Sequence, residues 1–104
     1  MSEIIGVAWR GGTYGIKIPE RAVRFQNFDR RWGTVTLLLQ GHERPVEVNI
    51  DKESFWDADC GELIATEIGR WMASKGLAPW PRGNPPHLRL HPISPGVFEV
   101  SPIH

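Results

Sequence analysis

The segment GTVTLLLQ at Gly33–Gln40, followed by PVEVNI at Pro45–Ile50, decides the fold. In both, apolar and polar residues alternate, which is the pattern of a β-strand that buries one face and exposes the other. The connection between them, residues 41–44, is polar and has the length of a hairpin loop. The sequence therefore predicts an antiparallel pair of strands at the centre of a sheet.

Four further segments have a strand-like composition. They are Ile4–Trp9, Tyr14–Ile18, His87–His91 and Val97–Ser101. Short connections between neighbouring segments favour hairpins. We therefore expect an α+β protein with a mostly antiparallel sheet of about six short strands, either open or partly closed into a barrel.

One main helix is expected at about residues 60–75, packed on the sheet. Its apolar residues recur every four positions, so a helix would place them on one face. These residues are Cys60, Ile64, Ile68 and Met72. Asp59 and Glu62 have the spacing of a capping box at the start of that helix, and Gly76 can end it in a left-handed conformation. A second, short helix is expected at about residues 20–28.

The composition is that of a globular chain with an unusual share of tryptophan. The 104 residues suit a single domain spanning residues 1–104, and they include five tryptophans, 11 glycines and 9 prolines. One cysteine excludes an internal disulfide framework and a thiolate-rich zinc site. No apolar stretch approaches the roughly 18 residues of a membrane helix. We expect a cytoplasmic protein without a membrane partner.

Charge is balanced overall but uneven along the chain. Twelve basic residues match twelve acidic ones, so no net field attracts nucleic acid or an anionic membrane. Residues 51–67 hold one base and six acids, whereas residues 68–104 hold four bases and one acid. The acidic region and the positively charged ends of the chain, residues 1–50 and 68–104, can complement each other between copies, and a net charge near zero removes the repulsion that keeps copies apart. The sequence predicts self-association as a two-fold homodimer.

The segment WPRGNPP at Trp80–Pro86 is the most distinctive local feature. A tryptophan beside prolines presents a large ring at little entropic cost, and an arginine adds a fork of donors. The strand that follows places two histidines and an arginine on one face, where they would form a cationic strip. The candidate binding residues are Trp80, Arg82, Asn84, His87, Arg89 and His91. The structural alternative is that Trp80 folds down over the end of the sheet.

A second candidate surface combines arginine and aromatic residues. Its members are Arg21, Arg24, Arg30, Arg31 and Trp32. Arginines and stacking rings together are the composition of a phosphate-and-base contact, which makes nucleic acid an alternative partner. The same pattern also fits a short amphipathic helix that buries Phe25 and Phe28 and keeps its arginines outside.

A short motif adds to the nucleic-acid alternative. The residues GIKIP at Gly15–Pro19, followed by Arg24, resemble the strand-to-helix entry of AbrB-like and plant B3-type DNA-binding domains. This resemblance implies DNA binding. The chain departs from the pattern after its main helix, where Ala78, Pro79 and Trp80 stand in place of a glycine–aspartate pair.

No set of residues with a catalytic spacing is present. The acids around Cys60 disfavour its thiolate, and two strand residues four apart, such as His87 and His91, are about 13 Å apart, too far for one metal ion. We therefore expect no catalytic residues, no metal and no cofactor.

The leading hypothesis is a small non-enzymatic interaction module, similar in general character to short bacterial proteins, that binds a protein partner or itself. The alternatives are a nucleic-acid-binding domain and a small enzyme or ligand carrier with a tryptophan-lined pocket.

Overall fold

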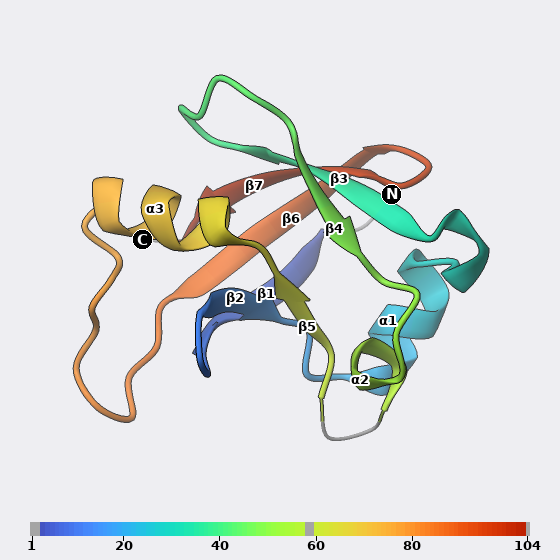
Figure 1. Cartoon of the computed structure of the whole chain (residues 1–104), viewed down its shortest axis with the longest axis horizontal. Helices are drawn as coiled ribbons and strands as arrows, with labels where there is room; N and C mark the ends of the chain where they lie inside the picture. Colours follow the sequence, from blue (N-terminus) through green and yellow to red (C-terminus); the bar gives the residue numbers. More distant parts are fainter. Residues whose placement is uncertain (1–2, 58–59, 104) are drawn as a thin grey trace.

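One sheet organises the computed structural model of the chain, which describes residues 3–57 and 60–103. Its strands are β1 (Ile4–Arg10), β2 (Tyr14–Lys17), β3 (Thr34–Leu39), β4 (Val46–Asn49), β5 (Glu62–Ile64), β6 (His87–Ser94) and β7 (Val97–Pro102). They lie in the order β4-β3-β7-β6-β1-β2-β5, and every pairing is antiparallel except that of β3 with β7. The antiparallel pairing of β3 with β4 is confirmed, but the pair lies at one edge of the sheet and not at its centre. The edge strands β4 and β5 approach each other, so the sheet nearly closes into a barrel (Figure 1).

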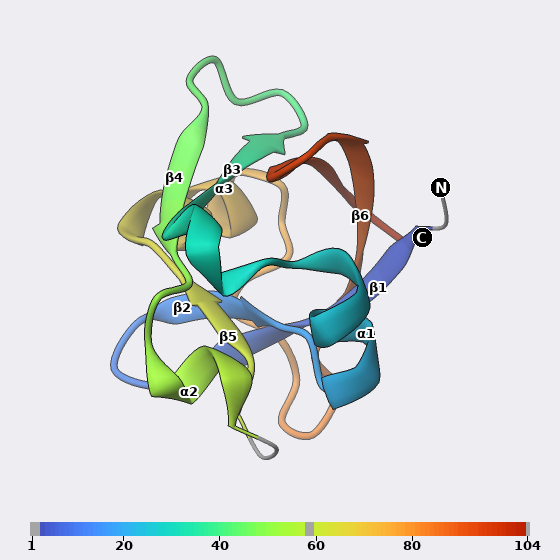
Figure 2. The same cartoon turned by 90° about the vertical axis from the view of Figure 1, so that its right-hand side faces the viewer.

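Short helices cover the two ends of this barrel. They are α1 (Arg21–Asn27), the 3-10 turn η1 (Arg30–Trp32), α2 (Glu53–Trp56) and α3 (Thr66–Ser74). In Figure 1, α3 lies at one end of the long axis and α1 and α2 lie at the other. Figure 2 looks onto the second end and shows α1 and α2 in front of the sheet. The predicted α+β class and the short helix near residues 20–28 are confirmed.

The alternating patterns of the predicted strands are reproduced in the burial of their side chains. Val35, Leu37 and Leu39 of β3 are buried and their neighbours are not. β4 and β7 alternate in the same way, and the inward residues of all strands form one core. Gly33 and Gly96 directly precede the parallel strands β3 and β7, at the same end of the pair, and both have positive φ angles, which suits glycine and lets the chain turn there.

The predicted helix at residues 60–75 is too long at its start. Residues 62–64 form β5, which pairs with β2, and α3 begins only at Thr66. Glu62 is therefore a strand residue and not part of a capping box, while Asp59 lies outside the described residues. Gly61 has a φ of +92°, a conformation that disfavours a continuous right-handed helix. The four-residue repeat that predicted the helix therefore ran through β5 as well as α3. Of its four residues, only Ile68 and Met72 lie on the apolar face of α3.

Arg24 joins α1 to α2 inside the protein. Its side chain is fully buried, with 0% exposed. Its Nη1 donates hydrogen bonds of 2.6 Å to the carbonyl oxygens of Phe55 and Asp57. These two carbonyls lie at the end of α2, where the chain leaves the helix; the Asp57 carbonyl also accepts the N–H of Cys60 at 3.2 Å. Arg24 therefore fixes the position of α2 relative to α1.

Candidate functional site: an aromatic groove

A short turn after α1 presents Trp32 to solvent. The side chain of Asp29 caps η1 by accepting a hydrogen bond of 2.9 Å from the backbone N–H of Arg31. The same carboxylate binds the Arg31 guanidinium, at 2.6 Å from Oδ2 to Nη2. Gly33 then ends the turn with a φ of +72°. These local bonds hold the backbone of Trp32 in one conformation, with 37% of the residue exposed.

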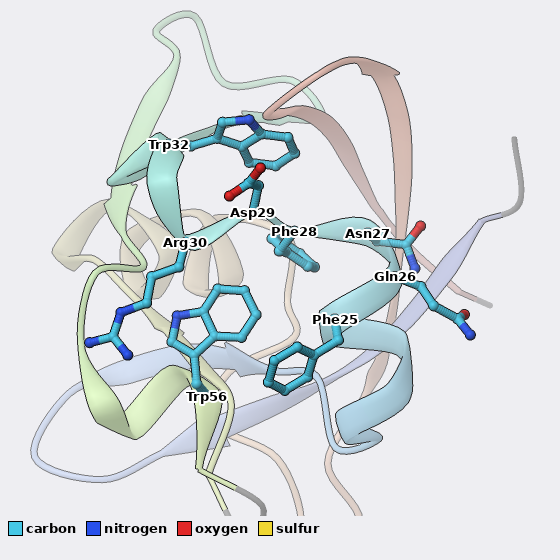
Figure 3. Close-up of a pocket in the computed structure, with 8 residues that line it drawn as sticks. All are labelled: Phe25, Gln26, Asn27, Phe28, Asp29, Arg30, Trp32 and Trp56. Carbon is cyan, nitrogen blue, oxygen red and sulfur yellow. The ribbon is translucent and has the colours of Figure 1, made fainter.

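Two pockets meet along the ring of Trp32. The first, of about 510 Å³, lies between α1, η1 and α2 and is lined by Phe25, Gln26, Asn27, Phe28, Asp29, Arg30, Trp32 and Trp56. The second, of about 500 Å³, lies beside the β6–β7 turn and is lined by Gln26, Asn27, Trp32, Pro92, Ser94, Pro95, Gly96 and Phe98. Because the two pockets share Gln26, Asn27 and Trp32, they form one surface, which we call the aromatic groove. Figure 3 shows Trp32 and Trp56 on opposite sides of the first pocket, with Phe28 behind them.

The floor of the groove is continuous with the core through a chain of rings. Phe28 stacks on Phe98 at 4.8 Å and contacts Phe55 at 5.0 Å between ring centroids. Phe55 contacts Trp56, which contacts Phe25, at 4.9 and 5.0 Å. Aromatic pairs at these distances add to the stability of packing. The groove is therefore built on a rigid base, and only its outermost rings, Phe25 and Trp32, are exposed.

Trp32 differs from the tryptophans of the core in its hydrogen bonding. The indole N–H of Trp56 donates to the Ile50 carbonyl at 2.8 Å, and that of Trp71 donates to the Gln40 carbonyl at 2.7 Å. Within residues 3–57 and 60–103, the indole N–H of Trp32 has no hydrogen-bond partner. The backbone of Gly96 lies close to the Trp32 ring, since a Cβ added to Gly96 would lie 3.5 Å from that ring. Trp32 thus offers a ligand both a ring face and a donor.

Ion pairs flank the groove on the side of α2. Arg30 Nε lies 3.1 Å from Asp51 Oδ1, and Arg30 Nη1 lies 3.1 Å from Glu53 Oε1. The hydrogen bonds that Arg30 donates to these carboxylates raise the pKa of its guanidinium. Asp51 and Glu53 remain exposed, with 65% and 88% of their side chains accessible. This border of the groove therefore carries more negative than positive charge.

The hydrogen bonds of Asp29, which caps η1, determine how this carboxylate titrates. Hydrogen bonds from Arg31 lower the pKa of Asp29 below its ordinary value of 3.8. Because the pKa of Asp29 is lower in the folded than in the unfolded chain, the Asp29 carboxylate stabilises the folded state at pH values above its unfolded pKa. This contribution is lost as the pH falls through the folded pKa. We expect an NMR titration to find Asp29 below 3.8 and the Arg31→Gln variant to raise its pKa. The matched change Arg44→Gln, on an exposed hairpin loop, should leave it unchanged; an Asp29 pKa unaffected by Arg31→Gln would contradict this geometry.

The structure divides the predicted binding residues between two other hollows. Trp80, Asn84 and His87 line one of about 330 Å³, where the Trp80 ring packs edge-on against Tyr14 at 5.5 Å. Trp80 is half-buried against the core, as the structural alternative for this residue had it. Arg82 lies exposed in the loop above.

Arg89 and His91 line a separate hollow of about 300 Å³ on the outer face of the sheet. His87, Arg89 and His91 do share one face of β6, as predicted. Arg89 Nε lies 2.8 Å from Glu3 Oε2, and His91 lies opposite Glu99 on β7. Carboxylates therefore interrupt the cationic strip that the sequence suggested.

The arginine and aromatic set is also divided. Arg21, Arg30, Arg31 and Trp32 are exposed around the groove, whereas Arg24 is buried and bonded to carbonyl oxygens. Arg24 therefore cannot reach a phosphate. Arg30 and Arg31 are paired with carboxylates, and Arg21 lies over the Phe25 ring at 5.1 Å.

Sequence reasoning identified Trp32 and Arg30 but missed the rest of the groove. The amphipathic-helix alternative placed both Phe25 and Phe28 inside, yet Phe25 is 55% exposed and only Phe28 is buried. The turn residues Pro95 and Gly96 line the groove because β7 runs parallel to β3 and brings the β6–β7 turn beside η1. The pairing of β3 with β7 joins residues far apart in the chain, so no local sequence pattern could predict it.

Comparisons with protein-family models, with curated proteins and with solved structures find no match to this chain. The short likeness to AbrB-like and plant B3-type domains is therefore a likeness of one segment. Among the described residues, no three His, Cys, Asp or Glu side chains gather closely enough to hold a metal ion. No helix in the described chain combines the length and apolar character needed to cross a membrane.

Proposed function

We propose that the chain is a non-enzymatic interaction module that binds a short segment of a protein in the aromatic groove. The observation that carries this proposal is Trp32, an exposed ring with an available N–H on a pre-ordered turn. Such a residue supplies contact area and a hydrogen bond at low entropic cost, which is why tryptophan anchors interfaces. The volume of the first pocket, about 510 Å³, lies in the range of ligand sites.

Proline-containing segments suit this surface best. Proline rings pack on flat aromatic side chains, and a segment stiffened by proline loses little freedom on binding. The backbone carbonyls of such a segment are free to accept the Trp32 N–H. The two adjacent pockets on either side of Trp32 provide room for successive residues of one ligand.

The nucleic-acid alternative uses the same ring differently. A base can stack on Trp32, but phosphate binding needs unpaired cations. Arg30 and Arg31 already bind carboxylates, and the net charge is zero.

An enzyme is the third alternative, and within the described chain the one buried charged side chain is Arg24, whose Nη1 donates to two carbonyls. That arrangement supplies no acid–base pair.

An NMR titration tests the proposal. We expect a proline-rich peptide containing one arginine to shift the indole N–H resonance of Trp32 and the amides of Gln26, Asn27 and Gly96. Trp32→Ala should weaken binding at least tenfold because it removes both the ring and the donor. Ile5→Ala is the matched control, since Ile5 is also an exposed apolar residue, 48% accessible, outside the groove.

Two outcomes would overturn the proposal. The first is a peptide titration, up to millimolar concentration, that leaves the groove resonances in place. The second is saturable, salt-sensitive binding of a single-stranded oligonucleotide to the same residues without any peptide binding, which would support the nucleic-acid alternative.

A further inference from the structure

We infer that the aromatic groove binds the Pro81–Asn84 turn of a second copy of this chain. This inference rests on the proposed function and names its ligand. Three observations support it: the shape of the turn, the charges at the two sites, and their positions in the molecule.

The loop between α3 and β6 ends in a tight, pre-ordered turn. The N–H of Asn84 donates a hydrogen bond of 3.0 Å to the carbonyl oxygen of Pro81. Gly83 has a φ of +78°, the value that a type II turn requires at its third position. Pro81, Arg82, Gly83 and Asn84 are all exposed. The turn therefore projects a proline ring and a guanidinium side by side, with little freedom left to lose on binding.

The charges of the two sites are complementary. Arg82 lies on the turn, and Glu53 and Asp51 lie at the border of the groove, where Arg30 satisfies them only in part. A carboxylate accepts several hydrogen bonds, so Glu53 can bind a second guanidinium while it keeps the first. The groove thus offers aromatic rings for Pro81 and a carboxylate for Arg82.

The two sites lie at opposite ends of one molecule. Figure 1 shows the loop between α3 and β6 at one end of the long axis and α1 and α2 at the other. The extent along that axis is 33 Å, so a chain cannot seat its own turn in its own groove. The contact is necessarily between copies, and it joins two different surfaces.

Charge reversal at the two positions tests this contact. In Arg82→Glu the new carboxylate would face Glu53 of the other copy, and in Glu53→Arg the new guanidinium would face Arg82, so each variant alone should stay monomeric. In an equimolar mixture, each kind of groove meets a turn of opposite charge. We expect sedimentation equilibrium to give 11.8 kDa for each variant alone and a higher mass, rising with concentration, for the wild type and for the mixture.

The controls separate the turn from the rest of the surface. Arg70→Glu reverses another exposed arginine, on α3, the helix at the same end of the molecule, and should leave association within about twofold of wild type. Trp32→Ala should abolish association of the wild-type chain, because it removes the ring that receives Pro81. Added salt should weaken association, since part of the attraction is between exposed charges.

A wild-type mass of 11.8 kDa at every concentration up to millimolar would overturn the inference. A mixture of the two variants that stays monomeric while the wild type associates would also overturn it, because another surface must then make the contact. If the proline-rich peptide still shifts Trp32 in either case, the proposed function stands and only the choice of a second copy fails. If the peptide shifts nothing, both fail.

Discussion

Replacing Arg24 by methionine is expected to lower the free energy of unfolding by about 2–4 kcal/mol, a large part of the roughly 5–15 kcal/mol typical of small proteins. Methionine retains the apolar stem but no donor. The carbonyl oxygens of Phe55 and Asp57, bonded at 2.6 Å in the native chain, would then lose these bonds. The Asp57 carbonyl would keep its bond from the Cys60 N–H, but the loss at the buried Phe55 carbonyl alone costs about 1–3 kcal/mol, and the Arg24 link between α1 and α2 would be gone.

Urea denaturation followed by circular dichroism measures this effect. Arg21→Met is the matched control, since Arg21 begins the same helix but is exposed, and we expect it to change stability by less than about 0.5 kcal/mol. Because Arg24 holds the α2 side of the groove, ligand binding should also weaken at temperatures where the variant is still folded. An Arg24→Met protein as stable as the Arg21→Met protein would show that the buried hydrogen bonds contribute nothing net.

Local patterns predicted the strands well because a strand in a nearly closed sheet buries alternate residues. Val35, Leu37 and Leu39 carry this signal in β3, and it needs no knowledge of the partner strand. The same argument missed β5, which has three residues and buries only Leu63 among them. A strand that short contains too little alternation to be separated from a helical repeat, so the pattern extends the following helix into it.

The groove could be predicted only where its residues share a local signal. Arg30 and Trp32 lie in one segment, whose composition indicates an arginine and aromatic surface. Pro95 and Gly96 reach Trp32 through the parallel β3–β7 pairing, which joins residues far apart in the chain.

Arg24 was predicted at the surface but is buried. Its charge suggested a surface residue, but the carbonyls at the end of α2 supply acceptors inside the protein.

Trp71 provides the second large effect. Its side chain is 2% exposed on the inward face of α3, between Ile68 and Met72, which are also buried. Truncation to alanine removes the largest fully buried side chain of the core and leaves a cavity that the short helix cannot fill by moving. We expect Trp71→Ala to lower the free energy of unfolding by about 3–5 kcal/mol, measured by urea denaturation.

Two further variants separate packing from hydrogen bonding at Trp71. Trp71→Phe keeps an aromatic ring but loses the N–H that donates to the Gln40 carbonyl at 2.7 Å, so we expect an intermediate loss of about 1–3 kcal/mol. Arg70→Ala, at the exposed neighbouring position, should cost less than about 0.5 kcal/mol. If Trp71→Ala cost no more than Arg70→Ala, α3 would not be held by its apolar stripe. The barrel end that α3 covers would then have to be stabilised by the loop after it, where Trp80 packs on Tyr14.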